Sequence, residues 1–159
     1  MSAKSAKLNW KVKAADPPKL TDQQWNLMGL IGLAFFVMAI LQLASFNDFK
    51  NWLQSISLGS PGVWAAVIIF AELWAAAGFF KLRLSTGFRI VSALMALLVS
   101  GFWFIQNLRL VSDGAGGILQ NSGYFGRFLH QSPGWWSVLE ASVFLFVVLW
   151  SVQLSKDNM

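Results

Sequence analysis

The strongest constraint on this chain is a set of four apolar segments, each about as long as a membrane span. A hydrocarbon core of about 30 Å requires roughly 20 helical residues. Apolar and polar residues do not alternate within the four segments, which excludes the strands of a membrane β-barrel. The segments are 25–45, 61–80, 86–107 and 135–154. They predict an all-α integral membrane four-helix bundle.

Composition supports a membrane protein. Only 12% of the residues are charged and 56% are apolar, whereas soluble domains contain about 25% charged and 45–50% apolar residues. A soluble domain of 159 residues could not remove this much apolar surface from water. The bilayer is therefore expected to cover most of it.

Polar residues flank the four segments. Residues 1–24 form a basic tail, and 155–159 form a polar C-terminus. The first apolar segment begins too far from the start, and is too long, for a secretory signal. Thr21 and Gln24 have the spacing of a capping box, which predicts a helix start there. The five tail lysines either contact anionic lipid headgroups or act only as topology signals.

The distribution of Lys and Arg predicts the orientation. Nine lie in the tail, in the link between the second and third segments, and at the C-terminus, and three lie in the other two loops. Both termini are therefore expected in the cytoplasm. Tryptophans anchor helices at membrane interfaces, and the candidate anchors of the outer interface are Trp52, Trp64, Trp135 and Trp136.

The two outer loops are expected to contain short amphipathic segments on the membrane surface. Two sets of apolar residues carry this prediction: Phe49, Trp52, Leu53 and Ile56 in the first loop, and Tyr124, Phe125, Phe128 and Leu129 in the second. Each loop ends in Ser-Pro-Gly shortly before a Trp, at 60–62 and 132–134, which predicts helix starts capped by Ser. Either the two helix pairs form a parallel repeat, or Ser-Pro-Gly is simply a common helix start.

Glu72 is the most informative single residue. It lies eleven positions after Pro61, about 16 Å along a helix, which is the middle of the bilayer. Ionised residues there cost roughly 2.5–3.5 kcal/mol and usually face the bundle interior. Its neighbours Ala65, Ala75 and Ala76 allow another helix to approach, so Glu72 is expected to point inward. It is either a ligand-binding or proton-handling carboxyl or a packing device hydrogen-bonded between helices.

Other polar residues lie toward the outer ends of the segments. Glu140 is about 8 Å inside Trp135 by helical rise, and an Arg109–Glu140 pair is expected, either functional or purely structural. The candidate ligand-binding or proton-handling residues of an outer vestibule are Gln42, Glu72, Gln106, Arg109 and Glu140. In the third segment, Ser92, Ala96 and Ser100 have the small-xxx-small spacing that favours close helix packing.

Several classes of chemistry are excluded or disfavoured. The chain has no Cys and one His, His130, which excludes disulfides and Cys-ligated or multi-His metal sites. Gly114 to Gly117 lack the Gly-Lys-Ser/Thr end of a phosphate loop, and no basic aromatic patch indicates nucleic-acid binding. No nucleophile–base pair or cofactor fingerprint is visible. The residues thus do not establish an enzyme and favour a non-catalytic protein without a metal.

The chain resembles the DoxX/MauE-like group of small four-helix bacterial membrane proteins, from Phe46 to about Leu154. The resemblance rests on Phe-x-x-Phe-Lys at 46–50, on Pro61, and on Phe-Ala-Glu-Leu at 70–73 with Gly78. Members are associated with respiratory or sulfur-compound redox systems, and the MauE branch with maturation of a disulfide-rich dehydrogenase. The resemblance implies the bacterial cytoplasmic membrane and an acidic residue in the second helix, matched by Glu72.

The expected function is that of an accessory membrane protein associated with a redox or quinone-linked complex. The alternatives are a structural subunit of a larger respiratory or photosynthetic assembly, and a small proton-linked transporter using Glu72. The expected cofactor is a quinone or a lipid. The expected partners are membrane lipids with other membrane subunits or further copies of the chain, and not nucleic acid.

Overall fold

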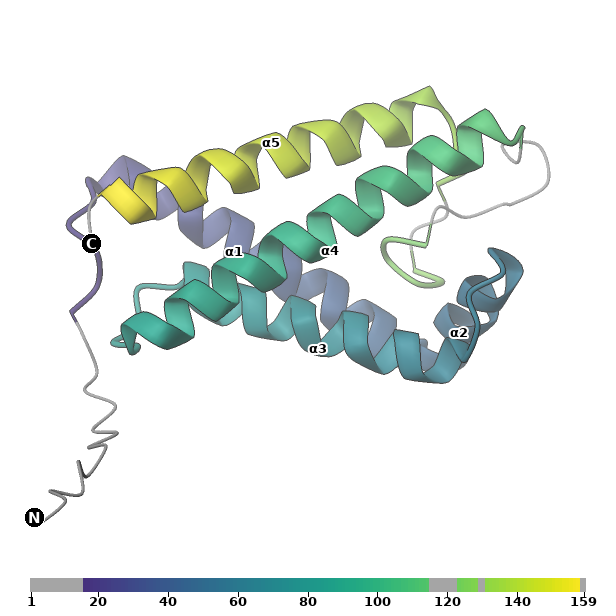
Figure 1. Cartoon of the computed structure of the whole chain (residues 1–159), viewed down its shortest axis with the longest axis horizontal. Helices are drawn as coiled ribbons and strands as arrows, with labels where there is room; N and C mark the ends of the chain where they lie inside the picture. Colours follow the sequence, from purple (N-terminus) through teal and green to yellow (C-terminus); the bar gives the residue numbers. More distant parts are fainter. Residues whose placement is uncertain (1–15, 115–122, 129–130, 158–159) are drawn as a thin grey trace, which may run out of the picture.

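The computed structural model describes residues 16–114, 123–128 and 131–157, which contain α-helices and no strand. The chain order of these helices can be followed in Figure 1. They are α1 (Asp22–Ala44), α2 (Phe46–Ser55), α3 (Pro61–Phe79), α4 (Thr86–Ser112) and α5 (Trp135–Asp157). The prediction of an all-α protein is confirmed for this part of the chain.

Helices α1, α3, α4 and α5 are long and apolar enough to cross a membrane. Their bounds agree with the predicted segments within a few residues, except that α4 continues five residues past Asn107 to Ser112. The described ends of the chain lie at one end of the bundle with the α3–α4 link (Figure 1). We call this the terminal end, and we call the end that carries α2 and residues 123–128 the loop end.

The helix starts agree only partly with prediction. The capping box of α1 is present: the Thr21 amide donates to Gln24 Oε1 at 2.9 Å, and the Gln24 amide donates to Thr21 Oγ1 at 3.3 Å. Helix α3 begins at Pro61, but Ser60 has φ 53° and does not cap with its side chain. The predicted Ser60 cap is therefore wrong, because a capping side chain normally requires an extended backbone. Helix α5 begins two residues after Pro133, at Trp135.

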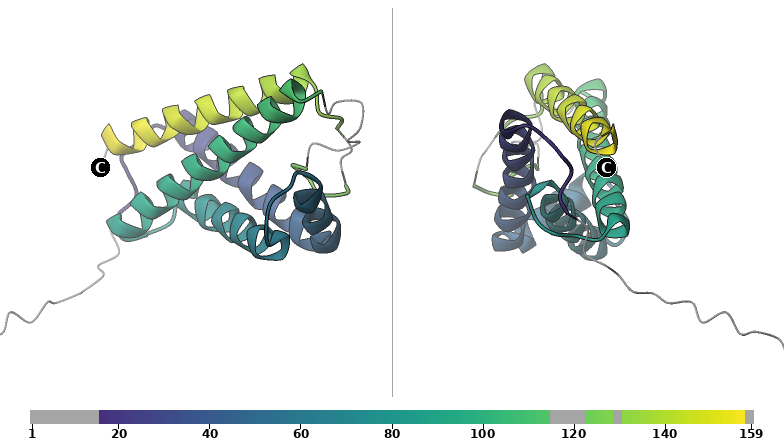
Figure 2. Two further views of the ribbon diagram at one scale, coloured as in Figure 1. Left: turned by 45° about the vertical axis from the view of Figure 1, so that its right-hand side comes forward. Right: turned by 90° about the vertical axis from the view of Figure 1, so that its left-hand side faces the viewer.

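Close contacts between small residues fix the packing of the spans. Helix α3 packs against both α1 and α4, and α5 packs against α4 (Figure 2). A Cβ atom at Gly78 of α3 would overlap the Cβ of Ser92 on α4. The Ser92 hydroxyl donates to the Trp74 carbonyl at 3.1 Å across this contact. The small-residue spacing of α4 thus does mark a close helix contact.

Helix α2 is the amphipathic helix predicted for the first outer loop, but its apolar face does not lie on the membrane surface. Phe49 and Leu53 are 1% and 0% exposed, and α2 packs on α3. The prediction failed on this point because the amphipathic pattern shows only that one face is buried. Here that face is covered by protein.

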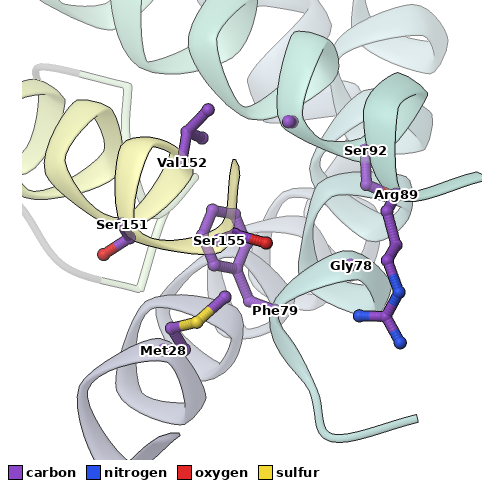
Figure 3. A pocket seen from close by; sticks show the side chains of 9 residues that line it. Met28, Gly78, Phe79, Arg89, Ser92, Ser151, Val152 and Ser155 are labelled. Atoms are coloured by element: carbon purple, nitrogen blue, oxygen red, sulfur yellow. The ribbon is translucent and has the colours of Figure 1, made fainter. Parts of the chain in front are cut away.

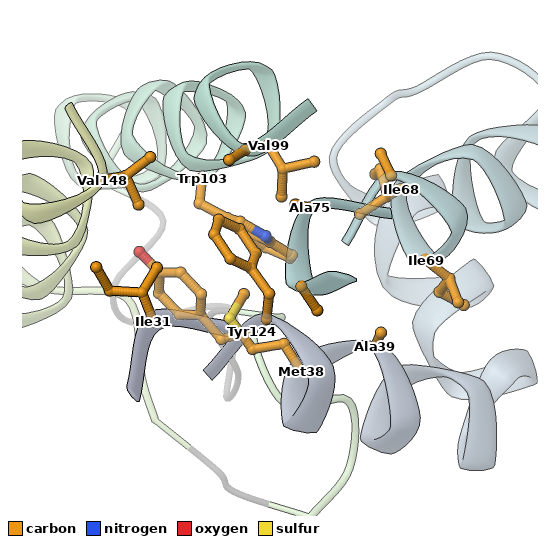
Figure 4. Packing of buried hydrophobic residues seen from close by; sticks show 14 of the residues in the cluster. Ile31, Met38, Ala39, Ile68, Ile69, Ala75, Val99, Trp103, Tyr124 and Val148 are labelled. Atoms are coloured by element: carbon orange, nitrogen blue, oxygen red, sulfur yellow. The ribbon is translucent and has the colours of Figure 1, made fainter. Parts of the chain in front are cut away.

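The described part of the second outer loop, residues 123–128, forms turns and not the predicted amphipathic segment. Gly123 and Gly126 have positive φ angles of 89° and 57°, which a right-handed helix does not permit. Tyr124 is only 6% exposed, and Figure 4 shows its side chain in the buried cluster with Ile31 and Trp103. The loop therefore inserts its tyrosine into the bundle. Leu129 and His130 lie outside the described residues.

Candidate functional site

Glu72 lies in the middle of α3 on the face that packs against the rest of the bundle. It is 0% exposed, and so are Ala65 and Ala75 on the same helix. The inward orientation predicted from these small neighbours is therefore the one observed. Small side chains allow α1 and α4 to approach, and this brings polar groups from both helices to the carboxyl.

Two side chains donate hydrogen bonds to one oxygen of Glu72. Trp103 Nε1 of α4 donates to Oε1 at 3.0 Å, and Gln42 Nε2 of α1 donates to the same oxygen at 3.2 Å. The Gln42 amide also donates to the backbone carbonyl of Tyr124 at 3.0 Å. We call these four residues the Glu72 cluster. It joins three spans and the 123–128 loop.

Aromatic rings surround the cluster at the loop end. The Trp103 ring lies 4.8 Å from the Tyr124 ring and 5.5 Å from the Trp52 ring, measured between centroids. The Phe49 ring of α2 lies 6.2 Å from Trp103. These rings separate the carboxyl from the loop-end surface, and a low dielectric around it strengthens every hydrogen bond that it makes.

The cluster contains more acceptor oxygens than donors. Glu72 Oε2 and Gln42 Oε1 are buried without a hydrogen-bond partner, as are the Tyr124 hydroxyl and, one turn beyond Trp103 on α4, Asn107 Oδ1. Unsatisfied buried polar groups cost about 1–3 kcal/mol each, so several in one place leave hydrogen-bonding capacity for a bound molecule, either water or a ligand. The two amide oxygens accept only, and Glu72 Oε2 accepts while the carboxyl is ionised. A molecule that donates hydrogen bonds would satisfy all three.

The Tyr124 hydroxyl stays protonated in this setting. Burial raises the pKa of the phenol, and the negative charge of Glu140 raises it further. The hydroxyl can therefore donate as well as accept. As a hydroxyl, this one atom can serve either kind of partner.

No cation neutralises Glu72 within the described ranges. The ion pairs found there lie elsewhere: Arg83–Asp16, Arg109–Asp113 and Arg127–Asp48. An uncompensated buried charge is costly. The carboxyl is therefore suited to take up a proton or a hydrogen-bond donor, and not to anchor a structural ion pair.

The predicted outer vestibule is only partly assembled. Gln42 and Glu72 are joined, but Arg109 pairs with Asp113 on its own helix at 3.4 Å. Glu140 is exposed and accepts a hydrogen bond from Gln131. The expected Arg109–Glu140 pair is therefore wrong, because each partner finds a nearer group in its own part of the chain. Gln106 is half-buried, and its Oε1 has no hydrogen-bond partner.

The tryptophans expected to be interface anchors fall into two groups. Trp64, Trp135 and Trp136 are 44%, 72% and 67% exposed, which is compatible with contact to lipid. Trp52 is half-buried, and its ring stacks on Phe49 at 6.1 Å between centroids. Its role as a surface anchor is not supported, because its ring belongs to the aromatic layer over the Glu72 cluster.

Trp103 and Tyr124 were not among the predicted site residues. The sequence did contain a signal for Trp103, since the small-residue face of α4 at Ser92, Ala96 and Ser100 continues at helical spacing to Trp103 and Asn107. That face is the one that packs inward. Tyr124 belongs to the apolar set that predicted an amphipathic segment on the membrane surface, and that pattern gave no signal that its side chain enters the bundle.

Comparison with protein-family models, with curated proteins and with solved structures gives no match. The Glu72 cluster is therefore interpreted from its own geometry and chemistry.

Proposed function

We propose that this protein is a small DoxX-like accessory protein of the bacterial cytoplasmic membrane, which binds a quinol-class ligand at the Glu72 cluster for a redox- or quinone-linked complex. The observation that carries the proposal is the hydrogen-bonded pair Glu72 and Gln42, in which each side chain keeps one buried oxygen without a donor. The two hydroxyl groups of a quinol are hydrogen-bond donors on an apolar molecule. Such a molecule reaches the cluster from the bilayer.

The 123–128 loop is the segment that would move to admit the ligand. Tyr124 is bound to Gln42 through one backbone carbonyl, and its ring covers Trp103. Withdrawal of the loop would uncover the Trp103 ring. It would also free the Gln42 N–H that donates to the Tyr124 carbonyl, so that this N–H could donate to the ligand. Aromatic rings and a few placed polar groups are typical of small-molecule sites.

The proposed orientation places the terminal end in the cytoplasm. The described basic residues of this end include Lys19, Lys81, Arg83 and Lys156. An excess of Lys and Arg in short loops is typical of the cytoplasmic side. Glu72 then lies near the middle of the bilayer, and α2 and the 123–128 loop cover the Glu72 cluster on the outer side.

A second candidate is a structural subunit of a larger membrane assembly. Helix α5 supports this second candidate. Only 28% of the residues in its most apolar stretch are buried, a smaller share than in any of the other three spans. The aromatic side chains Trp135, Trp136, Phe146 and Trp150 are each more than half exposed on it. Either lipid or neighbouring subunits would cover them.

The test is purification of the protein from its native membrane in nanodiscs, followed by mass spectrometry of everything that is retained. Glu72→Gln keeps the size of the side chain but replaces an acceptor oxygen with a donor, so it should reduce retained quinol by about tenfold, or 1.4 kcal/mol. Glu140→Gln makes the same change at an exposed position and should retain the ligand.

Three outcomes would count against the proposed ligand. These are no quinone in the wild-type preparation, equal retention by Glu72→Gln and wild type, and equal loss in both variants. Partner subunits in fixed ratio without a quinone would instead support the assembly subunit.

A further inference from the structure

Arg89 differs from the other two basic residues around the α3–α4 link. Lys81 Nζ lies 5.7 Å from the Trp25 ring centroid, and Arg83 pairs with Asp16 at 3.4 Å. Arg89 is only 6% exposed, and no ion pair within the described residues includes it. A buried guanidinium without an anion carries an uncompensated charge.

Arg89 lines a partly enclosed cavity between α1, α3, α4 and α5, as Figure 3 shows. Three serines share this lining, one on α4 and two on α5: Ser92, Ser151 and Ser155. The cavity has about 20 Å³ available to the centre of a water-sized group. This is room for one water molecule or for one oxygen of a larger ligand.

Several donor groups around the cavity have hydrogen-bonding capacity to spare. One terminal guanidinium nitrogen of Arg89 donates to the Leu82 carbonyl at 2.6 Å, while Arg89 Nε is buried without a partner. Ser151 Oγ is also buried without a partner, but Figure 3 shows its hydroxyl directed away from Arg89. Figure 3 shows the Ser155 hydroxyl facing the α4 side of the cavity. Guanidinium and hydroxyl donors together are the groups that bind phosphate oxygens in proteins.

The position of the cavity along the bundle matches a lipid headgroup. Arg89 is the fourth residue of α4, and Ser155 is the third residue from the end of α5, so both lie about one helical turn from the terminal end. The other lining residues include Met28 and Phe79, which are buried in the core, and Val152, which is half-buried and offers apolar surface to an acyl chain. This is the depth at which a bilayer changes from headgroups to hydrocarbon.

We propose that Arg89, with Ser155, forms a binding site for a phosphate group, supplied by an anionic phospholipid of the leaflet at the terminal end. One phosphate oxygen enters the cavity and accepts from the guanidinium and a serine hydroxyl. The acyl chains extend from there into the hydrocarbon along Val152, which is half-buried. The site is separate from the Glu72 cluster, and its occupancy does not depend on the function proposed for that cluster.

The proposal is tested by native mass spectrometry of the full chain released from nanodiscs that contain equal amounts of phosphatidylglycerol and phosphatidylcholine. Wild type should retain at least about five times as much phosphatidylglycerol as phosphatidylcholine, as expected for a charge-assisted contact. Arg89→Gln should abolish the preference. Arg83→Gln is the matched control, because it removes an exposed arginine of the same link and should keep the preference.

Two further measurements complete the test. Ser155→Ala should lower retention without removing charge, and it serves where Arg89→Gln does not fold. Added inorganic phosphate distinguishes a lipid phosphate from free phosphate as the ligand. If it displaces phosphatidylglycerol, the site binds free phosphate and the lipid proposal is overturned. If phosphatidylglycerol stays bound, the lipid proposal is supported. The site itself is refuted if wild type shows no preference. It is also refuted if the variant that folds, Arg89→Gln or Ser155→Ala, retains phosphatidylglycerol as wild type does.

Discussion

Substitution of Gly78 by Ala tests how closely α3 and α4 approach. A Cβ atom at this position would overlap Ser92 Cβ and would lie 2.8 Å from Ser92 Oγ. Carbon atoms pack best at about 3.5–4.0 Å, so the helices must separate there by roughly 1 Å. Both atoms of Ser92 belong to a short, stiff side chain next to the α4 backbone. The clash is therefore not relieved by a change of rotamer alone.

The expected loss of stability follows from three contributions. Overpacking typically costs about 1–3 kcal/mol. Separation of the helices also breaks the 3.1 Å hydrogen bond from Ser92 to the Trp74 carbonyl, which adds about 0.6 kcal/mol for a bond between membrane helices. The better helix propensity of Ala returns up to about 1 kcal/mol. The net change is a loss of about 1.5 kcal/mol, or roughly tenfold in the unfolding equilibrium constant.

The assay is reversible unfolding in mixed micelles, titrated with sodium dodecyl sulfate and followed by tryptophan fluorescence. Gly101→Ala is the matched control on α4, because a Cβ there would meet nothing within 4 Å. It should be neutral or stabilising. In a Ser92→Gly background, Gly78→Ala should lose its cost. Equal stability of Gly78→Ala and Gly101→Ala, or an undiminished cost in that background, would refute the close contact.

Three further predictions use the same preparation. Thr21→Ala should lower the free energy of unfolding by about 1 kcal/mol, because the box with Gln24 is lost; no change would show that the cap is dispensable. Gly126→Ala should destabilise the 123–128 loop, seen as faster amide hydrogen exchange there, because its φ is 57° and a Cβ would overlap Ser45 Oγ; unchanged exchange would contradict this. Tyr124 is the single tyrosine, so absorbance at 295 nm, corrected with Tyr124→Phe, reports its ionisation alone. Burial raises the pKa of the Tyr124 phenol in the folded protein. The free energy of unfolding should therefore fall as the pH rises above about 10, where the unfolded chain loses this proton first. Ionisation of Tyr124 near pH 10 in the folded protein would contradict its burial.

The spans and the start of α1 could be predicted because local sequence determines them. Twenty consecutive apolar residues specify a membrane helix wherever they occur, and the box at Thr21 involves residues three positions apart. The burial of Glu72 followed from alanines at helical spacing. Each of these inferences needs only the geometry of one helix.

The composition of the site could not be predicted in the same way. Trp103 and Gln42 meet Glu72 across 31 and 30 residues of sequence, and Gln42 meets Tyr124 across 82. Such contacts depend on the rotation of whole helices and on the path of a loop. Arg109 illustrates the opposite error, since a partner expected on another helix is replaced by Asp113 one turn away.

The side-chain amide of Gln42 has a mechanical consequence. Its single nitrogen holds the Glu72 carboxyl and the Tyr124 backbone at the same time, and it carries two hydrogens, one for each. A pull on the 123–128 loop is therefore transmitted to α3 through one rigid planar group. Any partner that displaces the loop would therefore also displace a hydrogen-bond donor of the buried Glu72 carboxyl.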